Sequence, residues 1–124
     1  MTLEIQKFAD PGDLDKERIV FKVIESLDLG MYVVLRSGAG DEGRPKSGSK
    51  SAYWFPDSAV NVGDLVVLYT KSGRSSKKVL NTEKTAHFYY WQQTVPFWGS
   101  DTATTAVLIK AETWTYKPPP KAVL

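Results

Sequence analysis

The stretch that decides the fold is YWFPDSAVNVGDLVVLY, which occupies residues 53–69. It begins with an aromatic run of the kind that is enriched in strands. Pro56 cannot donate a ladder hydrogen bond, so it ends that strand or lies on a sheet edge. Gly63 and Asp64 are typical of a turn, and the apolar run 64–71 predicts the best strand of the chain. Within this strand we expect Leu65 and Val67 to face the core.

The same alternation, with a period of two, recurs on both sides of this stretch. It predicts strands at residues 3–8, 18–24, 31–36, 52–55, 64–71, 85–91 and 104–111, with a β-like continuation at 113–117. Long polar loops are predicted at 37–51 and 72–84, and one short helical turn near 13–17. Seven or eight short strands with almost no helix predict an all-β fold, and the long loops favour a β-sandwich over a barrel.

Length and composition limit the class of protein. A chain of 124 residues with 42% apolar residues predicts one domain with a real core. We place that domain at residues 1–117, followed by a Pro-rich tail at 118–124 of extended, polyproline-like chain. The absence of cysteine excludes disulfides and thiolate chemistry. No apolar run is long enough for a membrane span or a signal peptide, so we expect a cytoplasmic protein.

The charge is small overall but unevenly distributed. The formal net charge is +2, yet residues 1–30 hold seven acids against four bases, and residues 31–84 hold nine bases against five acids. A net charge this small argues against a nucleic-acid partner. The bases of the second segment fall mainly in its loops, where they predict either a solvated surface or a weak patch for an anionic partner.

The segments around this stretch resemble the lamin tail domain family. The resemblance rests on the Tyr53–Pro56 step, on the apolar strand at 62–68, on WGSD at 98–101 with Val and Leu at 107–108, and on the early strand YVVL at 32–35. The chain departs from the family where a Leu-Ser-Gly-Trp step is replaced by the 37–51 loop. The resemblance implies an immunoglobulin-like β-sandwich and a non-catalytic interaction module.

Residues that carry chemistry are sparse. The run GAGDEG at 38–43 formally matches a dinucleotide-binding loop, but Pro45 and Gly48 follow where that motif needs a helix. His87 is the only histidine, and its place in an aromatic strand favours a structural role. The acids at 10–17 lack the spacing of a helix-loop-helix calcium site, and turn aspartates such as Asp64 usually bond their own backbone. We therefore expect no enzyme, cofactor or metal.

The remaining candidate surface is the aromatic strand 87–91 with the basic loop before it. Alternation places His87, Tyr89 and Trp91 on one face and Phe88 with Tyr90 on the other, and a two-layer sandwich should leave one of these faces outside. Exposed aromatic patches often mark interfaces. We expect protein contacts, including homo-oligomers, with weak nucleic-acid or polyanion binding through the loops 37–51 and 71–84 as the alternative. The candidate surface comprises Tyr89, Tyr90, Trp91, Arg74, Lys77 and Lys78.

Overall fold

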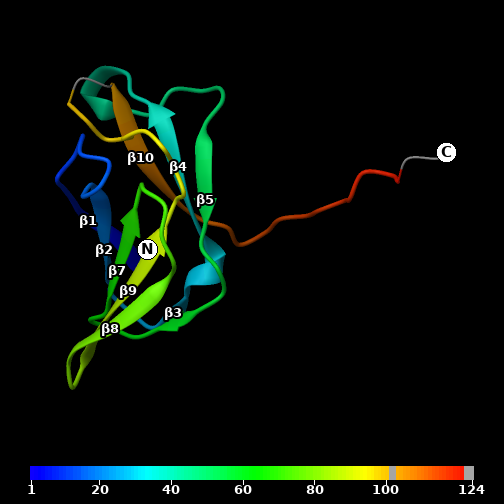
Figure 1. The fold of residues 1–124 in the computed structure, drawn as a ribbon. Helices are drawn as coiled ribbons and strands as arrows, with labels where there is room; N and C mark the ends of the chain where they lie inside the picture. Colours follow the sequence, from blue (N-terminus) through cyan, green and yellow to red (C-terminus); the bar gives the residue numbers. More distant parts are fainter. Residues whose placement is uncertain (101–102, 122–124) are drawn as a thin grey trace.

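The computed structural model describes residues 1–100 and 103–121 and shows an all-β chain (Figure 1). Two short 3-10 helices, η1 (Leu29–Met31) and η2 (Asp41–Gly43), lie in connections. The strands are β1 (Leu3–Ala9), β2 (Arg18–Val23), β3 (Leu27–Asp28), β4 (Tyr32–Gly38), β5 (Ser51–Trp54), β6 (Ala59–Val60), β7 (Leu65–Tyr69), β8 (Ser76–Asn81), β9 (Lys84–Tyr90) and β10 (Thr104–Lys110).

The strands form two main sheets over one core. The five-stranded sheet has the order β1-β2-β7-β9-β8, and the three-stranded sheet has the order β10-β4-β5. The short strands β3 and β6 pair with each other. All pairs are antiparallel except β7 with β9, which is parallel. The β8–β9 hairpin folds back so that β9 lies beside β7 and β8 becomes the sheet edge.

The stretch at residues 53–69 forms both predicted strands, but they belong to different sheets. β5 is the edge of the three-stranded sheet, and β7 is the centre of the five-stranded sheet. Phe55 lies at the crossing, and its side chain is buried. Its ring makes edge-on contacts with Phe21, at 5.8 Å between centroids, and with Tyr89, at 5.4 Å. The stretch therefore connects the two layers and fills the core between them.

The expectation that Leu65 and Val67 face the core is wrong. Val66 lies opposite Phe21 in the ladder, and Val66 and Leu68 are the β7 residues of the core cluster. Val67 lies on the other side of the sheet, opposite Val20 and Phe88. It is still buried there, because its neighbours on that face are large. Alternation alone could not decide the direction, since both sets of side chains in β7 are apolar.

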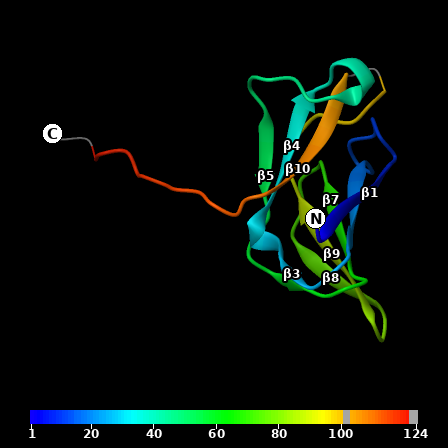
Figure 2. The ribbon, with the colours of Figure 1, turned by 180° about the vertical axis from the view of Figure 1, so that it is seen from behind.

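The other predicted strands are confirmed within one or two residues, except at 113–117, where the chain is extended without a ladder. The last ladder bond there runs from the Ala111 amide to the Met31 carbonyl, at 2.7 Å. Beyond it the tail projects away from the body, as both ribbon views show (Figures 1 and 2). The predicted turn near 13–17 is present, with the Glu17 amide bonded to the Asp13 carbonyl at 2.6 Å.

The two predicted loops contain more structure than expected. Residues 76–81 of the predicted loop 72–84 form the edge strand β8, whose residues are all exposed. Because β8 contains two lysines and no buried side chain, it shows no hydrophobic alternation and could not be recognised in the sequence. Lysines are common on edge strands, where they prevent pairing with another chain. In the loop 37–51, a bridge pairs Ala39 with Pro45 before β5 begins. Among the described residues, none belongs to a helix long and apolar enough to cross a membrane.

Candidate interaction surfaces

The aromatic strand β9 divides its side chains between the core and the outside. Tyr89 and Trp91 point into the core and are each 6% exposed, which removes them from the predicted surface. His87 is buried on the same side, as alternation predicts. Phe88 and Tyr90 lie on the outer side and are half-buried. The burial of Tyr89 and Trp91 follows from the position of β9 over the densest part of the core.

The outer side of the five-stranded sheet collects aromatic rings and cations, and we call it the basic-aromatic face. The rings of Tyr69 and Tyr90 stack with centroids 5.2 Å apart and planes 12° apart. Cations lie over the Tyr69 ring, with the Arg18 guanidinium at 5.8 Å and the Lys71 amine at 5.1 Å. Ladder register places Arg18, Lys22, Tyr69, Lys78, Phe88 and Tyr90 on this face.

The loop at 71–75 holds part of this face in place. Gly73 packs so closely on the Tyr90 ring that a Cβ atom at Gly73 would lie 2.4 Å from it. The Gln92 side chain bonds both the carbonyl of Gly73, at 2.7 Å, and its amide, at 3.3 Å. Of the predicted bases in this region, Arg74, Lys77 and Lys78 are all exposed.

The two basic loops do not form one surface. The segment after β4 lies at one end of the molecule, and the β8–β9 hairpin lies at the other (Figure 1). The view from behind shows the same separation (Figure 2). Of the bases in 71–84, Lys71 and Lys78 lie on the basic-aromatic face instead.

The outer side of the three-stranded sheet is apolar, and we call it the β4 outer face. Val34 and Tyr32 point inward to the core, so the alternate residues of β4 point out. In the ladder, Val33 lies between Trp54 and Ile109, and one row further Leu35 lies between Ala52 and Val107. Directly opposed residues share a face. The β4 outer face therefore comprises Val33, Leu35, Ala52, Trp54, Val107 and Ile109, and carries no charged residue.

The C-terminal tail adds aromatic rings to this face. The Trp114 ring meets the Trp54 ring edge-on at 4.9 Å, and the Tyr116 ring lies 6.3 Å from that of Trp114. The indole Nε1 of Trp54 donates to the Gly30 carbonyl at 2.7 Å, which fixes the ring that Trp114 contacts. Among the described residues, four aromatic side chains count as exposed: these three, and Phe8, which lies elsewhere, on β1 against Trp98.

The sequence did not single out Trp54, Trp114 or Tyr116 as surface residues. Trp114 and Tyr116 are two positions apart in an extended chain, so they share a side, and Pro118 follows where a ladder could not continue. This spacing of two aromatic residues before a proline run could have indicated an exposed aromatic side of the tail. The role of Trp54 had no local signal, because it depends on the pairing of β5 with β4.

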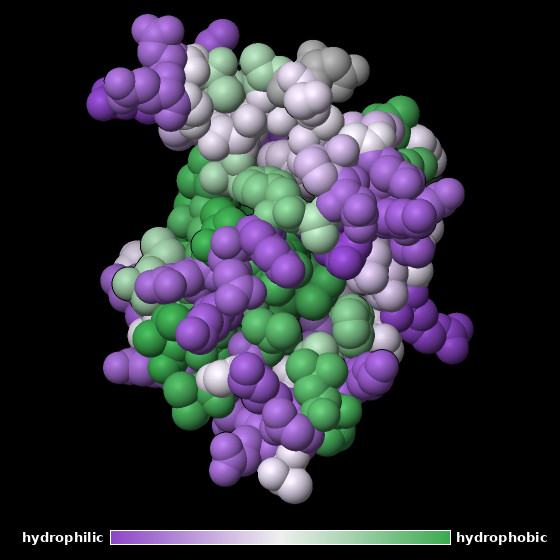
Figure 3. Space-filling view, turned by 90° about the vertical axis from the view of Figure 1, so that its left-hand side faces the viewer, coloured by the Kyte–Doolittle hydropathy of each residue, from purple (hydrophilic) through white to green (hydrophobic). Residues whose placement is uncertain are grey.

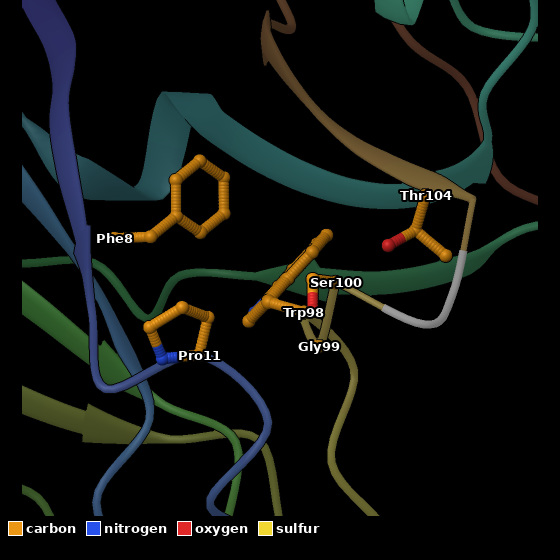
Figure 4. A pocket seen from close by; sticks show the side chains of 6 residues that line it. All are labelled: Phe8, Pro11, Trp98, Gly99, Ser100 and Thr104. Carbon is orange, nitrogen blue, oxygen red and sulfur yellow. The ribbon is translucent and has the colours of Figure 1, made fainter.

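A shallow pocket of about 300 Å³ opens beside β1 (Figure 4). Its walls are the Phe8 and Trp98 rings, 5.3 Å apart in an edge-on contact, with Pro11, Gly99, Ser100 and Thr104. On the side of the molecule that carries β1, apolar surface is broken up by hydrophilic side chains (Figure 3). The described residues of the pocket lining include no ionisable side chain.

The carboxylate of Glu17 is fully buried and organises the segment that forms the pocket wall. Its Oε1 accepts from the amides of Gly12, at 2.9 Å, and Trp98, at 3.2 Å. Its Oε2 accepts from the Phe97 amide, at 2.7 Å, and from the Thr70 hydroxyl. These four bonds are the way in which a buried charge is made tolerable. The carboxylate is thus committed to holding the chain at 97–98 and is not free for chemistry.

A second buried polar group joins Asp64 to His87. The carboxylate of Asp64 accepts from the Asn61 amide at 3.1 Å, as expected for a turn aspartate, and also from the Thr85 amide at 3.1 Å. His87 Nε2 lies 2.9 Å from the same carboxylate. Burial opposes the charge of Asp64, but the bond to His87 and the two backbone amides outweigh it, so the pKa of Asp64 is lowered.

The arrangement around His87 is that of a structural link. Since a carboxylate only accepts, Nε2 carries the proton that it donates to Asp64. The other ring nitrogen, Nδ1, is buried without a hydrogen-bond partner, and no nucleophile lies in the pair. Elsewhere in the core, burial, together with Tyr89, raises the pKa of Tyr53. In the described parts of the chain, no group of three His, Cys, Asp or Glu side chains is placed to hold a metal ion.

Comparison of the chain with protein-family models and with curated proteins found no match. Among the described residues, the β4 outer face with its tail carries three of the four exposed aromatic rings, and the ladder residues of this face carry no charge.

Proposed function

We propose that this protein is a non-catalytic interaction module that binds a protein partner through the β4 outer face and the aromatic tail. The observation that carries the proposal is the concentration of exposed rings there. Trp54 is 48% exposed, Trp114 57% and Tyr116 82%, all on or beside a sheet face without charge. Interfaces are enriched in such aromatic residues and depleted of charge at their centre.

The exposed area is large enough to matter for binding. Taking about 250 Å² for a Trp and about 200 Å² for a Tyr side chain, the exposed parts of the three rings amount to about 400 Å². A contiguous apolar patch of this size is at the scale where monomer surfaces become functional. Met31 and Ile109, each nearly 40% exposed, extend it. Trp and Tyr are also the residues in which binding energy concentrates.

The same proposal includes the immunoglobulin-like sandwich of the lamin tail domains as the fold. Two sheets over one core, with a Tyr53–Pro56 step that crosses from one sheet to the other, support a sandwich of this kind. The two-residue strands β3 and β6 and the parallel pairing of β7 with β9 are further features of this sandwich. A structure of a homologous protein should show the same features. A module of this fold acts by presenting surfaces, which agrees with the buried state of Glu17 and Asp64.

Site-specific photo-crosslinking tests the proposal. A benzophenone side chain replaces Ile109 on the β10 edge of the face, and a control carries it at Val79, which is 72% exposed on β8. In extract of the source organism, we expect discrete products from position 109 only. Addition of the Trp54→Ser substitution to the position-109 probe should weaken these products. Equal labelling from both positions, or none from position 109, would contradict the proposal.

The basic-aromatic face supports a second candidate function, the binding of a single-stranded polyanion. Single-strand binders combine cations with aromatic rings, and here Arg18 and Lys71 lie against the Tyr69 ring that stacks on Tyr90. An oligonucleotide titration monitored by fluorescence should show binding that weakens with salt. The double variant Lys22→Gln/Lys78→Gln should reduce the salt dependence. Absence of binding at low ionic strength would remove this candidate.

A further inference from the structure

We infer that the partner of the β4 outer face is a second copy of this chain, and that the tail beyond Trp114 of each copy lies across the β4 outer face of the other. This inference rests on the proposed function, because it names the partner of the same surface. The supporting observation is the position of the tail. Its first part contributes Trp114 to the apolar surface, and the rest projects away from the sheets of the same molecule (Figures 1 and 2).

The tail cannot complete its own sheet. After the Ala111 amide bonds the Met31 carbonyl, the chain departs from the ladder, and Trp114 contacts the body at Trp54. Residues 117–121 are all exposed, and the ribbon views show them pointing away from both sheets (Figures 1 and 2). Pro118–Pro120 have no amide hydrogen to pair with a strand edge. The tail is therefore suited to lie across strands by side-chain contact.

The length of the tail fits a neighbouring sheet. The seven residues 115–121 span about 22 Å in polyproline conformation. Three adjacent strands are about 10 Å wide from the first backbone to the last. The tail of one copy can therefore cross β5, β4 and β10 of another copy and still bring Tyr116 onto the face.

A second copy matches this surface better than an unrelated protein would. A two-fold interface uses the same patch on both molecules, so the patch must be complementary to itself. Here each chain supplies both an uncharged face and an aromatic arm, and the two cations of the arm, Lys117 and Lys121, meet no cation among the ladder residues of that face. The three exposed rings provide about 400 Å² per copy, which is half of the about 800 Å² per partner in a standard interface. Met31, Ile109 and the proline run supply further area.

Sedimentation equilibrium of the purified full chain, from low micromolar to several hundred micromolar, tests the inference. We expect a monomer–dimer equilibrium. The tail variant Trp114→Ser/Tyr116→Ser and the face variant Ile109→Lys should each weaken dimerisation at least about tenfold. Val79→Ser removes an exposed apolar side chain far from the face and should leave it unchanged. All substituted side chains are exposed, and unchanged melting temperatures will show that each variant is folded.

Mixing the two variants distinguishes an exchanged tail from simple face-to-face contact. The tail of the Ile109→Lys chain is intact, and so is the face of the tail variant. A heterodimer of the two therefore keeps one of the two tail-to-face contacts, and we expect it to be tighter than either variant homodimer. A dimer dissociation constant that the tail substitutions leave unchanged would overturn the inference. A protein that is monomeric at all concentrations would overturn it too. A monomer that still gives the position-109 crosslink to another protein would overturn the inference and leave the proposed function intact.

Discussion

Replacement of Glu17 by Gln tests the strongest claim about the interior, that one carboxylate holds the 97–98 segment in place. The substitution keeps the size of the side chain and removes its charge. One carboxylate oxygen becomes an NH₂ group, which faces either the amides of Gly12 and Trp98 or the Phe97 amide and the Thr70 hydroxyl. In both orientations at least one buried backbone amide loses its acceptor.

The magnitude follows from these contacts. An orphaned buried donor costs about 1–3 kcal/mol, and the bonds that remain lose the strengthening that a charged acceptor provides. We therefore expect Glu17→Gln to lower the free energy of unfolding by about 2–5 kcal/mol, a large share of the about 5–15 kcal/mol typical of a domain. At about 4 °C per kcal/mol, the melting temperature should fall by about 8–20 °C.

Urea denaturation followed by Trp fluorescence measures this loss. Thr70→Val removes only the hydroxyl, so it should cost less than Glu17→Gln, and Glu25→Gln at an exposed carboxylate should change almost nothing. Hydrogen exchange adds a local readout, since the amides of Phe97 and Trp98 should lose protection before the rest of the sheet. A loss below about 1 kcal/mol with those two amides still protected would refute the reasoning.

Three further outcomes are expected. The lowered pKa of Asp64 means that its contribution to stability is present above the unfolded-state pKa of about 3.9 and is lost as the pH falls below it, so Asp64→Asn should flatten the acid limb of a stability–pH curve. Gly73→Ala should cost about 1–3 kcal/mol in denaturation, because the Cβ meets the Tyr90 ring. Val66→Asp should unfold the domain, as judged by circular dichroism, whereas Val67→Asp should cost less, since Val67 lies on the outer side of the sheet, where Arg18 and Lys22 are close in the ladder, although Val67 itself is buried.

The parts of the fold that could be predicted are those with a local signal. The period of two at 18–24 and 104–111 is set by side chains within each strand, and both strands are present at nearly those positions. The division of residues 87–91 into two faces was predictable for the same reason. Which of these two faces is buried was not, because that depends on the layer packed against β9.

The parts that could not be predicted depend on residues far apart in the chain. Of the four groups that bond the Glu17 oxygens, one is the nearby Gly12 amide, and the other three lie 53, 80 and 81 positions further along. The burial of Glu17 depends on these distant residues. The strand β8 exists because β9 offers it a ladder, and its own side chains contribute no buried surface. The residues of 53–69 similarly predict two strands, but not that the chain passes from one sheet to the other between them.

The residues of the β4 outer face are more apolar than a strand with one face in solvent requires. The runs Val33–Leu35 and Val107–Ile109 are apolar at every position, and such runs are typical of strands covered on both faces. In the structure β4 and β10 belong to a sheet with only one face against the core, and β10 is its edge. In the described part of the chain, Trp54 and Ile109 on the other face remain exposed. We propose that a partner molecule covers them, and that the aromatic tail after β10 does so from a second copy.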